Sequence, residues 1–170
     1  MTERLTVGTP EAMEHFGSVL AAQLRAGDVV VLTGELGAGK TTLTRGLGAA
    51  LGVRGTVTSP TFVLARTHPR DGAPPLVHVD AYRLRDALEL DDLDLDLAGS
   101  ITVVEWGAGL IDQLVDEWLA ITIERPTGAG ADTDRDGAEA DGEIVEPRTV
   151  LVEGVGARWA DLGWLHAARD

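Results

Sequence analysis

One stretch of the chain combines glycines, a lysine and a hydroxyl at a spacing that suits phosphate chemistry. Gly34, Gly39, Lys40 and Thr41 follow the order G-x-x-x-x-G-K-T of a phosphate-binding loop. Glycine adopts backbone conformations that a Cβ forbids, so successive N–H groups of such a loop can point at an anion. Lys40 could then reach the β- and γ-phosphates of a nucleotide, and the Thr41 hydroxyl could take one coordination position on Mg²⁺. The motif therefore predicts a site for a nucleoside triphosphate.

A chance glycine turn before a helix is the alternative interpretation of this stretch. Lys40 is the only lysine in the chain, where arginine serves at every other permanently charged basic position. A compact ammonium charge suits a phosphate cradle, so lysine at this one position favours the phosphate site. We expect the loop and the start of its helix to bind the cofactor, through Glu35, Leu36, Gly37, Ala38, Gly39, Lys40, Thr41 and Thr42.

Two carboxylates end predicted strands elsewhere in the chain. Asp80 closes the strand expected at 76–80, and Glu105 closes the one expected at 101–105. Ligands of open α/β sheets collect at the carboxyl ends of strands, so either carboxylate could serve a metal ion or orient an attacking water. A solvated strand-end carboxylate is the plainer alternative. With Lys40, these two residues form the predicted catalytic set.

Two further segments flank these candidates. The hydroxyl cluster 59–61 lies between a predicted helix and a predicted strand, where nucleotide switches often occur, although Pro60 also fits an ordinary turn. Trp106 directly follows Glu105, and its indole could lie beside the nucleotide or pack in the core. Thr61 and Trp106 complete the expected cofactor-binding residues.

Hydrophobic patterning predicts the elements that must hold these residues. We expect strands at 5–7, 29–33, 62–67, 76–80, 101–105, 118–124 and 148–154. Helices are expected from Thr9-Pro10 to about 26, from the loop to Gly52, in short pieces within 86–97, at 110–115 and at 157–168. The fold class expected is α/β, a three-layer P-loop nucleotide hydrolase fold with a central, mostly parallel sheet and antiparallel edge strands.

Composition limits the class of protein and its partners. The 170 residues fit one domain, with a flexible acidic loop expected at 127–147 because that stretch is rich in Gly, Ala, Asp and Glu. Cysteine is absent, and no apolar run approaches the roughly 20 residues that span a bilayer. We expect a cytoplasmic protein without membrane contact. The net charge of −14 argues against tight direct binding of RNA or DNA.

Four motifs together resemble the TsaE (YjeE) family of small bacterial ATPases of tRNA threonylcarbamoyladenosine synthesis. They are the loop at 34–42, Ser59-Pro60-Thr61-Phe62, His78-Val79-Asp80-Ala81-Tyr82-Arg83 and Val104-Glu105-Trp106. The resemblance implies an ATPase that assists the partner pair TsaB and TsaD, which modifies adenosine 37 of certain tRNAs. It also implies that Thr41 and Glu105 serve Mg²⁺, that Asp80 holds the metal's water shell, and that 59–62 is a switch.

Other functions of a phosphate-binding loop compete with this interpretation. A small-molecule phosphotransferase is the main alternative, and enzymes of that class usually carry an arginine-bearing lid over the phosphates. No arginine-rich lid is apparent in the sequence, but the alternative stays open because of Arg66, Arg70, Arg83 and Arg85. Guanine recognition by an Asn-Lys-x-Asp motif is excluded, because the chain has no asparagine and no second lysine. A module that holds nucleotide without hydrolysis is disfavoured by the carboxylates Asp80 and Glu105.

Overall fold

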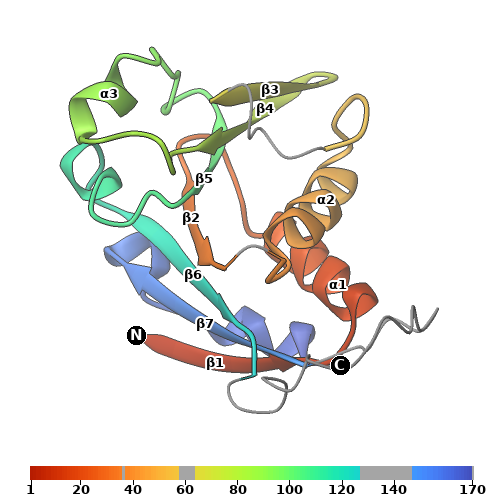
Figure 1. Cartoon of the computed structure of the whole chain (residues 1–170). Helices are drawn as coiled ribbons and strands as arrows, with labels where there is room; N and C mark the ends of the chain where they lie inside the picture. Colours follow the sequence, from red (N-terminus) through yellow and green to blue (C-terminus); the bar gives the residue numbers. More distant parts are fainter. Residues whose placement is uncertain (36, 58–63, 127–146, 170) are drawn as a thin grey trace, which may run out of the picture.

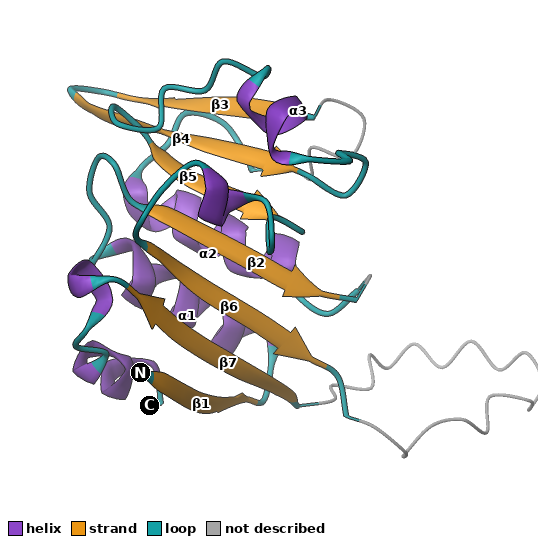
Figure 2. Ribbon diagram, turned by 90° about the vertical axis from the view of Figure 1, so that its left-hand side faces the viewer, coloured by secondary structure: helices purple, strands orange, loops and turns teal. Residues whose placement is uncertain are grey.

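The computed structural model describes residues 1–35, 37–57, 64–126 and 147–169. All described strands join one seven-stranded sheet in the order β1-β7-β6-β2-β5-β4-β3, shown in Figures 1 and 2. The strands are β1 Thr2–Val7, β2 Val29–Gly34, β3 Ala65–Arg70, β4 Ala73–Asp80, β5 Ile101–Glu105, β6 Trp118–Glu124 and β7 Arg148–Val155.

The centre of the sheet is parallel and its edges are antiparallel. β2 pairs in parallel with β5 and with β6, and β4 pairs in parallel with β5. β3 joins β4 antiparallel at one edge, while β7 and β1 extend the other edge antiparallel to β6. The expected fold class is therefore confirmed.

Helical elements cover both faces of the sheet and make three layers (Figure 2). On one face lie α1 Pro10–Ala21, α2 Lys40–Leu51 and the C-terminal 3₁₀ turns η2 Ala157–Trp159 and η3 Gly163–Ala168. The other face is covered by α3 Ala87–Asp91 and the 3₁₀ turn η1 Ile111–Gln113. Alternate residues of β2 face the two cores, with Val30 and Leu32 toward α1 and α2 and Val29 and Val31 toward α3. In the described residues, no helix has the length and apolar composition needed to cross a membrane.

The helix that carries the phosphate-binding loop packs unusually close to α1. Gly17 of α1 and Gly46 of α2 make this approach possible. A Cβ on Gly17 would lie 2.4 Å from the carbonyl oxygen of Leu43, and one on Gly46 would lie 2.4 Å from that of Glu14. Neither backbone atom can move aside cheaply, so α1 fixes the position of α2 against the sheet.

Several helix and strand boundaries were predicted correctly from the residues that lie at them. Thr9 caps α1 by accepting a hydrogen bond from the Ala12 N–H at 3.0 Å, and proline occupies the first helical turn. Gly52 ends α2 in the left-handed conformation, with φ 73°. The strands expected at 101–105 and 118–124 have these same bounds in the structure.

Two expectations about strands were wrong in part. The strand expected at 62–67 is described only from Ala65 and runs on to Arg70, and β4 begins at Ala73 rather than 76. Pro69 is tolerated because β3 is an edge strand, where a missing N–H donor costs little, and Gly72 turns the hairpin with φ 67°.

The remaining errors concern short helices near the C-terminal half of the chain. The helix expected at 157–168 is two 3₁₀ turns, since the Asp161 carboxylate accepts the Gly163 N–H at 2.8 Å and interrupts the helix between them. The segment expected at 110–115 is the single 3₁₀ turn Ile111–Gln113. The acidic loop expected at 127–147 falls, apart from its last residue, outside the described residues.

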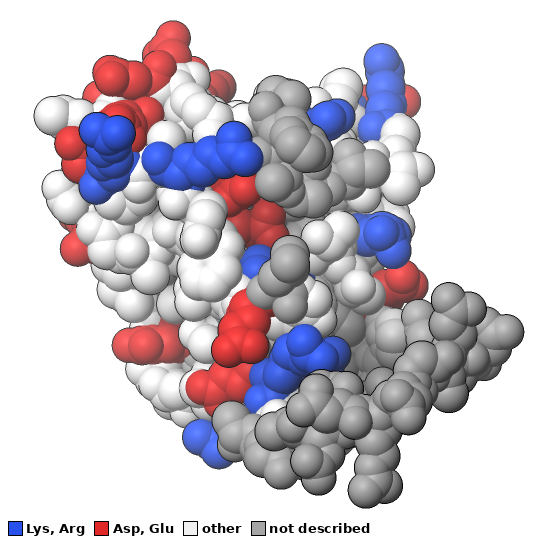
Figure 3. Space-filling view, viewed as in Figure 1, with Lys and Arg blue, Asp and Glu red and all other residues white. Residues whose placement is uncertain are grey.

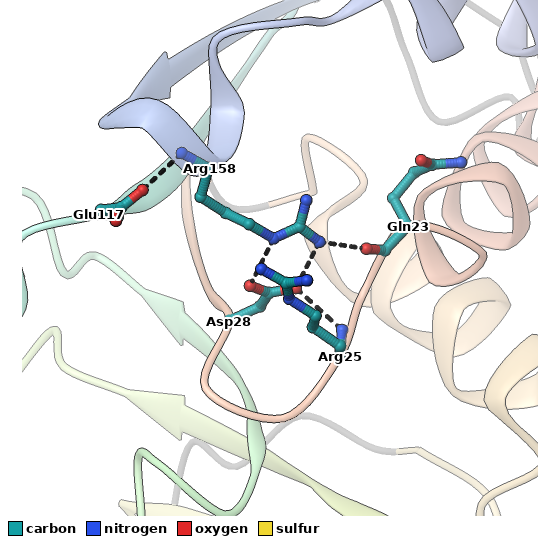
Figure 4. Close-up of polar contacts among 5 residues, drawn as sticks. All are labelled: Gln23, Arg25, Asp28, Glu117 and Arg158. Carbon is teal, nitrogen blue, oxygen red and sulfur yellow. Dashed lines mark hydrogen bonds and ion pairs between the residues drawn. The ribbon is translucent and has the colours of Figure 1, made fainter.

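A buried ion pair ties the C-terminal 3₁₀ turns to the connection between α1 and β2 (Figure 4). The Arg158 guanidinium donates to both carboxylate oxygens of Asp28, at 3.1 and 2.9 Å, and to the carbonyl oxygen of Gln23 at 2.5 Å. Asp28 also accepts the backbone N–H of Arg25 at 2.8 Å, and its side chain is only 6% exposed. The Arg158 N–H donates to Glu117.

We expect Arg158→Ala to lower the free energy of unfolding by about 3 kcal/mol, because it leaves the Asp28 carboxylate buried and without its counter-charge. Urea unfolding measures the change. Arg169→Ala is the matched control, since it breaks the exposed pair between Arg169 and Glu3 and should cost no more than about 1 kcal/mol. Equal costs for the two variants would contradict a stabilising role for the buried pair.

Candidate functional site

The carboxyl ends of β2, β4 and β5 meet at a cavity of about 620 Å³. This is the edge of a parallel sheet where ligands collect. In the space-filling view, acidic side chains lie beside a small basic surface within a hollow of this face (Figure 3). The described residues that line the cavity are Glu35, Gly37, Gly39, Lys40, Thr41, Thr42, Asp80, Tyr82, Glu105 and Trp106.

The phosphate-binding loop joins β2 to α2 through left-handed glycines. Gly37 has φ 77° and Gly39, at the N-cap of α2, has φ 117°. A side chain at either position would be strained, so the sequence G-x-G at this turn is required by the backbone. Ala38 between them is buried and does not line the cavity. The loop thus leaves its backbone, rather than side chains, facing the cavity.

An arginine distant in sequence supports the same loop from behind. Arg148, the first residue of β7, donates through Nε to the carbonyl oxygen of Ala38 at 3.2 Å and through a terminal nitrogen to that of Gly37 at 3.5 Å. These contacts tie the loop to the start of β7. The sequence alone did not predict them, because no local pattern links residues about 110 positions apart.

Lys40 is buried and lies among opposite charges. Its Nζ donates to the carbonyl oxygens of Gly34 at 2.5 Å and Glu35 at 3.3 Å. Burial lowers the pKa of Lys40, and the negative charges of Glu105 and Asp80 oppose that shift. The ammonium therefore sits where an anion of the ligand could replace the backbone carbonyls as its partner.

Trp106 forms part of the cavity wall through an unusual backbone conformation. Its φ of 62° is left-handed, which costs a residue with a Cβ on the order of 1–2 kcal/mol. In this conformation the indole lies over Lys40, with Nζ 4.7 Å from the ring centroid, and meets the Tyr82 ring edge-on at 5.7 Å. Strained residues that persist in a fold cluster at functional sites. Of the two placements left open for Trp106, the structure has the one at the cavity.

The two predicted carboxylates lie on neighbouring strands in register. Asp80 pairs with Glu105 across the β4–β5 ladder. The Tyr82 N–H donates to Asp80 at 3.0 Å, which orients that carboxylate. Glu105 is 5% exposed and lies beside the buried His78 ring, whose Nε2 is 3.2 Å from a Glu105 oxygen. Both carboxylates therefore face one cavity together with Lys40.

The donor set fits a magnesium nucleotide. Oxygen ligands from Thr41, Asp80 and Glu105 suit Mg²⁺, which binds through one or two carboxylates plus substrate phosphates and waters. No group of three or more His, Cys, Asp or Glu that could hold a metal alone occurs among the described residues. The left-handed glycines of the loop provide the complementary cradle for the phosphates.

The structure thus brings together most of the residues proposed from sequence. Leu36 and Thr61, with the whole hydroxyl cluster 59–62, lie outside the described residues. Tyr82 and His78 were not assigned to the site. His78 could have been found, because it alternates onto the same strand face as Asp80.

A second buried histidine gives the fold a pH dependence. Burial lowers the pKa of His68, and the electrostatic effect of the neighbouring His78 and Arg66 lowers it further. An ordinary histidine has a pKa of about 6.5. Below that pH, the unfolded chain therefore binds a proton at His68 that the folded chain binds less readily. This contribution to stability is complete at neutral pH and is lost as the pH falls.

We therefore expect His68→Gln to lose less stability than the parent when the pH is lowered from 7 to 5. The comparison is the change in unfolding free energy between the two pH values, measured with urea for each protein. His166→Gln, at an exposed position, should behave as the parent does. An unchanged pH dependence in His68→Gln would remove His68 as a source of acid sensitivity.

Comparison with known proteins shows to which family this chain belongs. The sequence model described as "Threonylcarbamoyl adenosine biosynthesis protein TsaE" matches residues 7–133. The chain belongs to the TsaE family. It is 56% identical over 152 residues to the tRNA threonylcarbamoyladenosine biosynthesis protein TsaE of Streptomyces coelicolor, a match that covers 87% of this chain and 94% of the relative.

More distant TsaE proteins and a solved structure agree with this assignment. The TsaE of Bacillus subtilis is 41% identical over 119 residues, covering 68% of this chain and 73% of the relative. The crystal structure of YdiB from the same organism has a TM-score of 0.66 and 31% identity, covering 94% of this chain and 89% of that one. The TsaE family match includes the loop and both carboxylates, whereas Arg148 lies beyond it.

Proposed function

We propose that the chain is a Mg²⁺-dependent ATPase and an accessory factor for threonylcarbamoylation of adenosine 37 in tRNA, acting in the cytoplasm with the TsaB–TsaD pair. Membership of the TsaE family supports a role in tRNA threonylcarbamoyladenosine biosynthesis. The observation that carries the ATPase proposal is the convergence of Lys40, Asp80 and Glu105 on one cavity beside a phosphate-binding loop.

Each residue of this set has a distinct proposed task. The N–H groups of the loop and the Lys40 ammonium hold the β- and γ-phosphates and neutralise their charge. Thr41 and Glu105 would hold Mg²⁺, which supplies charge neutralisation on the transferred phosphoryl group. Asp80 acts on the water shell of the metal. Either Glu105 or Asp80 orients the attacking water.

The charge of the chain supports a role through protein partners. Acidic residues outnumber Lys and Arg by 28 to 14, so the chain lacks the basic excess that replaces counterions along a tRNA backbone. A protein partner that binds tRNA would supply that contact instead. Hydrolysis by the isolated chain should then be slow, and the TsaB–TsaD pair should accelerate it. The cluster at 59–62 stays our predicted switch.

Two measurements test the proposal. Phosphate release from ATP and GTP, with and without TsaB and TsaD, should show ATP turnover that the partners raise. Titration of the labelled chain with the TsaB–TsaD pair should show tighter binding when a non-hydrolysable ATP analogue is present, because coupled sites raise each other's affinity by the same factor. Equal affinity in both titrations would favour a free-standing phosphotransferase.

A further inference from the structure

His78 is a fully buried histidine in the middle of β4 without an ordinary hydrogen-bond partner. Its exposed fraction is 0%, and neither ring nitrogen makes a hydrogen bond within the described residues. Polar groups in protein interiors are nearly always paired, so an unpaired buried imidazole needs an explanation. Neighbouring interior positions of the same strand face, such as Leu76, are aliphatic. An aliphatic side chain at 78 would avoid the cost of burying two nitrogens.

The Glu105 carboxylate lies close to this ring. Parallel pairing aligns His78 with Val103 and Asp80 with Glu105, so His78 lies behind the two carboxylates on the same face. Its Nε2 is 3.2 Å from Glu105 Oε2, although the pair does not form a hydrogen bond in the structure. The distance itself lies within the range of an N–H···O hydrogen bond.

The two oxygens of the Glu105 carboxylate have different surroundings. Its side chain is 6% exposed, and the residue lines the cavity together with Lys40 and Thr41. One oxygen lies against the His78 ring inside the protein. Carboxylates that hold a metal are commonly oriented by a hydrogen bond from a second group behind them, and loss of that group weakens metal binding or activity.

We propose that His78 is a positioning residue for Glu105. This inference rests on the proposed function, in which Glu105 serves Mg²⁺. The ring donates through Nε2 to one carboxylate oxygen and leaves the other for the cavity. It does not touch nucleotide, and no proton is transferred. Because His78 acts only through Glu105, its loss should affect Mg²⁺ and turnover far more than affinity for the nucleotide phosphates.

Two substitutions separate this role from simple packing. His78→Leu fills similar volume without a donor, whereas His78→Gln places an amide N–H near the position of Nε2. We expect His78→Leu to raise the Mg²⁺ concentration needed for half-maximal Mg²⁺-dependent nucleotide binding by about tenfold or more. Its kcat should fall by about 10- to 100-fold with little change in KM for ATP. His78→Gln should recover most of both effects.

His68→Leu is the matched control. His68 is also a buried histidine whose Nε2 has no hydrogen-bond partner in the described part of the chain, but it is not hydrogen-bonded or ion-paired to Glu105 there and does not line the cavity. Its replacement should leave the Mg²⁺ titration as in the parent. If His68→Leu and His78→Leu shift the titration equally, disturbance of the buried histidine region explains the result and the positioning role is wrong.

Nitrogen NMR of the unmodified chain, with ¹⁵N-labelled histidine and Mg·ADP, provides a readout that needs no substitution. The proposal requires a proton on Nε2 of His78. A proton on Nδ1 alone would overturn it, as would an unchanged Mg²⁺ titration in His78→Leu. Failure of the parent to bind Mg²⁺ with nucleotide at all would instead refute the proposed function, and this inference with it.

Discussion

Lys40→Ala is expected to weaken binding of Mg·ATP by about a hundredfold or more. The substitution removes the only lysine of the chain from a cavity that retains Asp80 and Glu105. Hydrogen bonds to charged groups contribute about 1.5–3 kcal/mol each, and the ammonium would no longer offset the repulsion between the two carboxylates and the phosphates. Isothermal calorimetry with a non-hydrolysable ATP analogue measures the loss.

Arg45→Ala is the matched control for this experiment. Arg45 is a cation on the same helix, but it is exposed and does not line the cavity. Its replacement should leave affinity close to that of the parent. If Lys40→Ala binds Mg·ATP as well as Arg45→Ala does, the loop is not a triphosphate site and the proposed function fails.

Glu105→Ala is expected to reduce ATP turnover by about 10²- to 10⁴-fold, the range for loss of a group that positions or deprotonates the nucleophile. Nucleotide affinity should stay within about tenfold, roughly 1.4 kcal/mol, because the carboxylate acts mainly on the transition state. Single-turnover phosphate release, with and without the TsaB–TsaD pair, separates the two quantities.

Glu124→Ala provides the comparison, since Glu124 also ends a central strand but is exposed and does not line the cavity. It should keep the turnover of the parent. Unchanged turnover in Glu105→Ala would transfer the water-orienting role to Asp80. In that case Asp80→Asn should lose turnover and show a weaker dependence on Mg²⁺.

Sequence patterns predicted those parts of the fold and of the site that depend on residues close together in the sequence. A strand buried on both faces is recognisable as an apolar run, as in β5. The bounds of both β5 and β6 were predicted. The phosphate-binding loop was equally clear, because its glycines and Lys40 must occupy fixed positions along the chain. The carboxylates Asp80 and Glu105 followed from the rule that ligands gather at strand ends.

What could not be predicted depends on contacts across the fold. The Arg158–Asp28 pair joins residues 130 positions apart, and the contact of Arg148 with the loop spans 110. The left-handed backbone conformation of Trp106 could not be predicted either. Tryptophan has no preference for this conformation, and only the packing around it in the folded protein imposes the strain. The His78–Glu105 contact required the register of β4 against β5, which alternation along one strand does not supply.

The close packing of Gly17 against Gly46 limits how far the phosphate-binding loop can be moved to another protein. Glycine within a helix costs roughly 1 kcal/mol relative to alanine, and α2 contains two. A strand–loop–helix segment covering 29–51, excised or grafted alone, would therefore keep the full motif yet hold a poorly formed helix. Substituting alanine for Gly46 would stabilise the helix of such a peptide. The same substitution would disrupt the packing of α2 on α1 in the parent, where position 46 touches the α1 backbone. A transferable nucleotide module from this chain would have to include α1 as well.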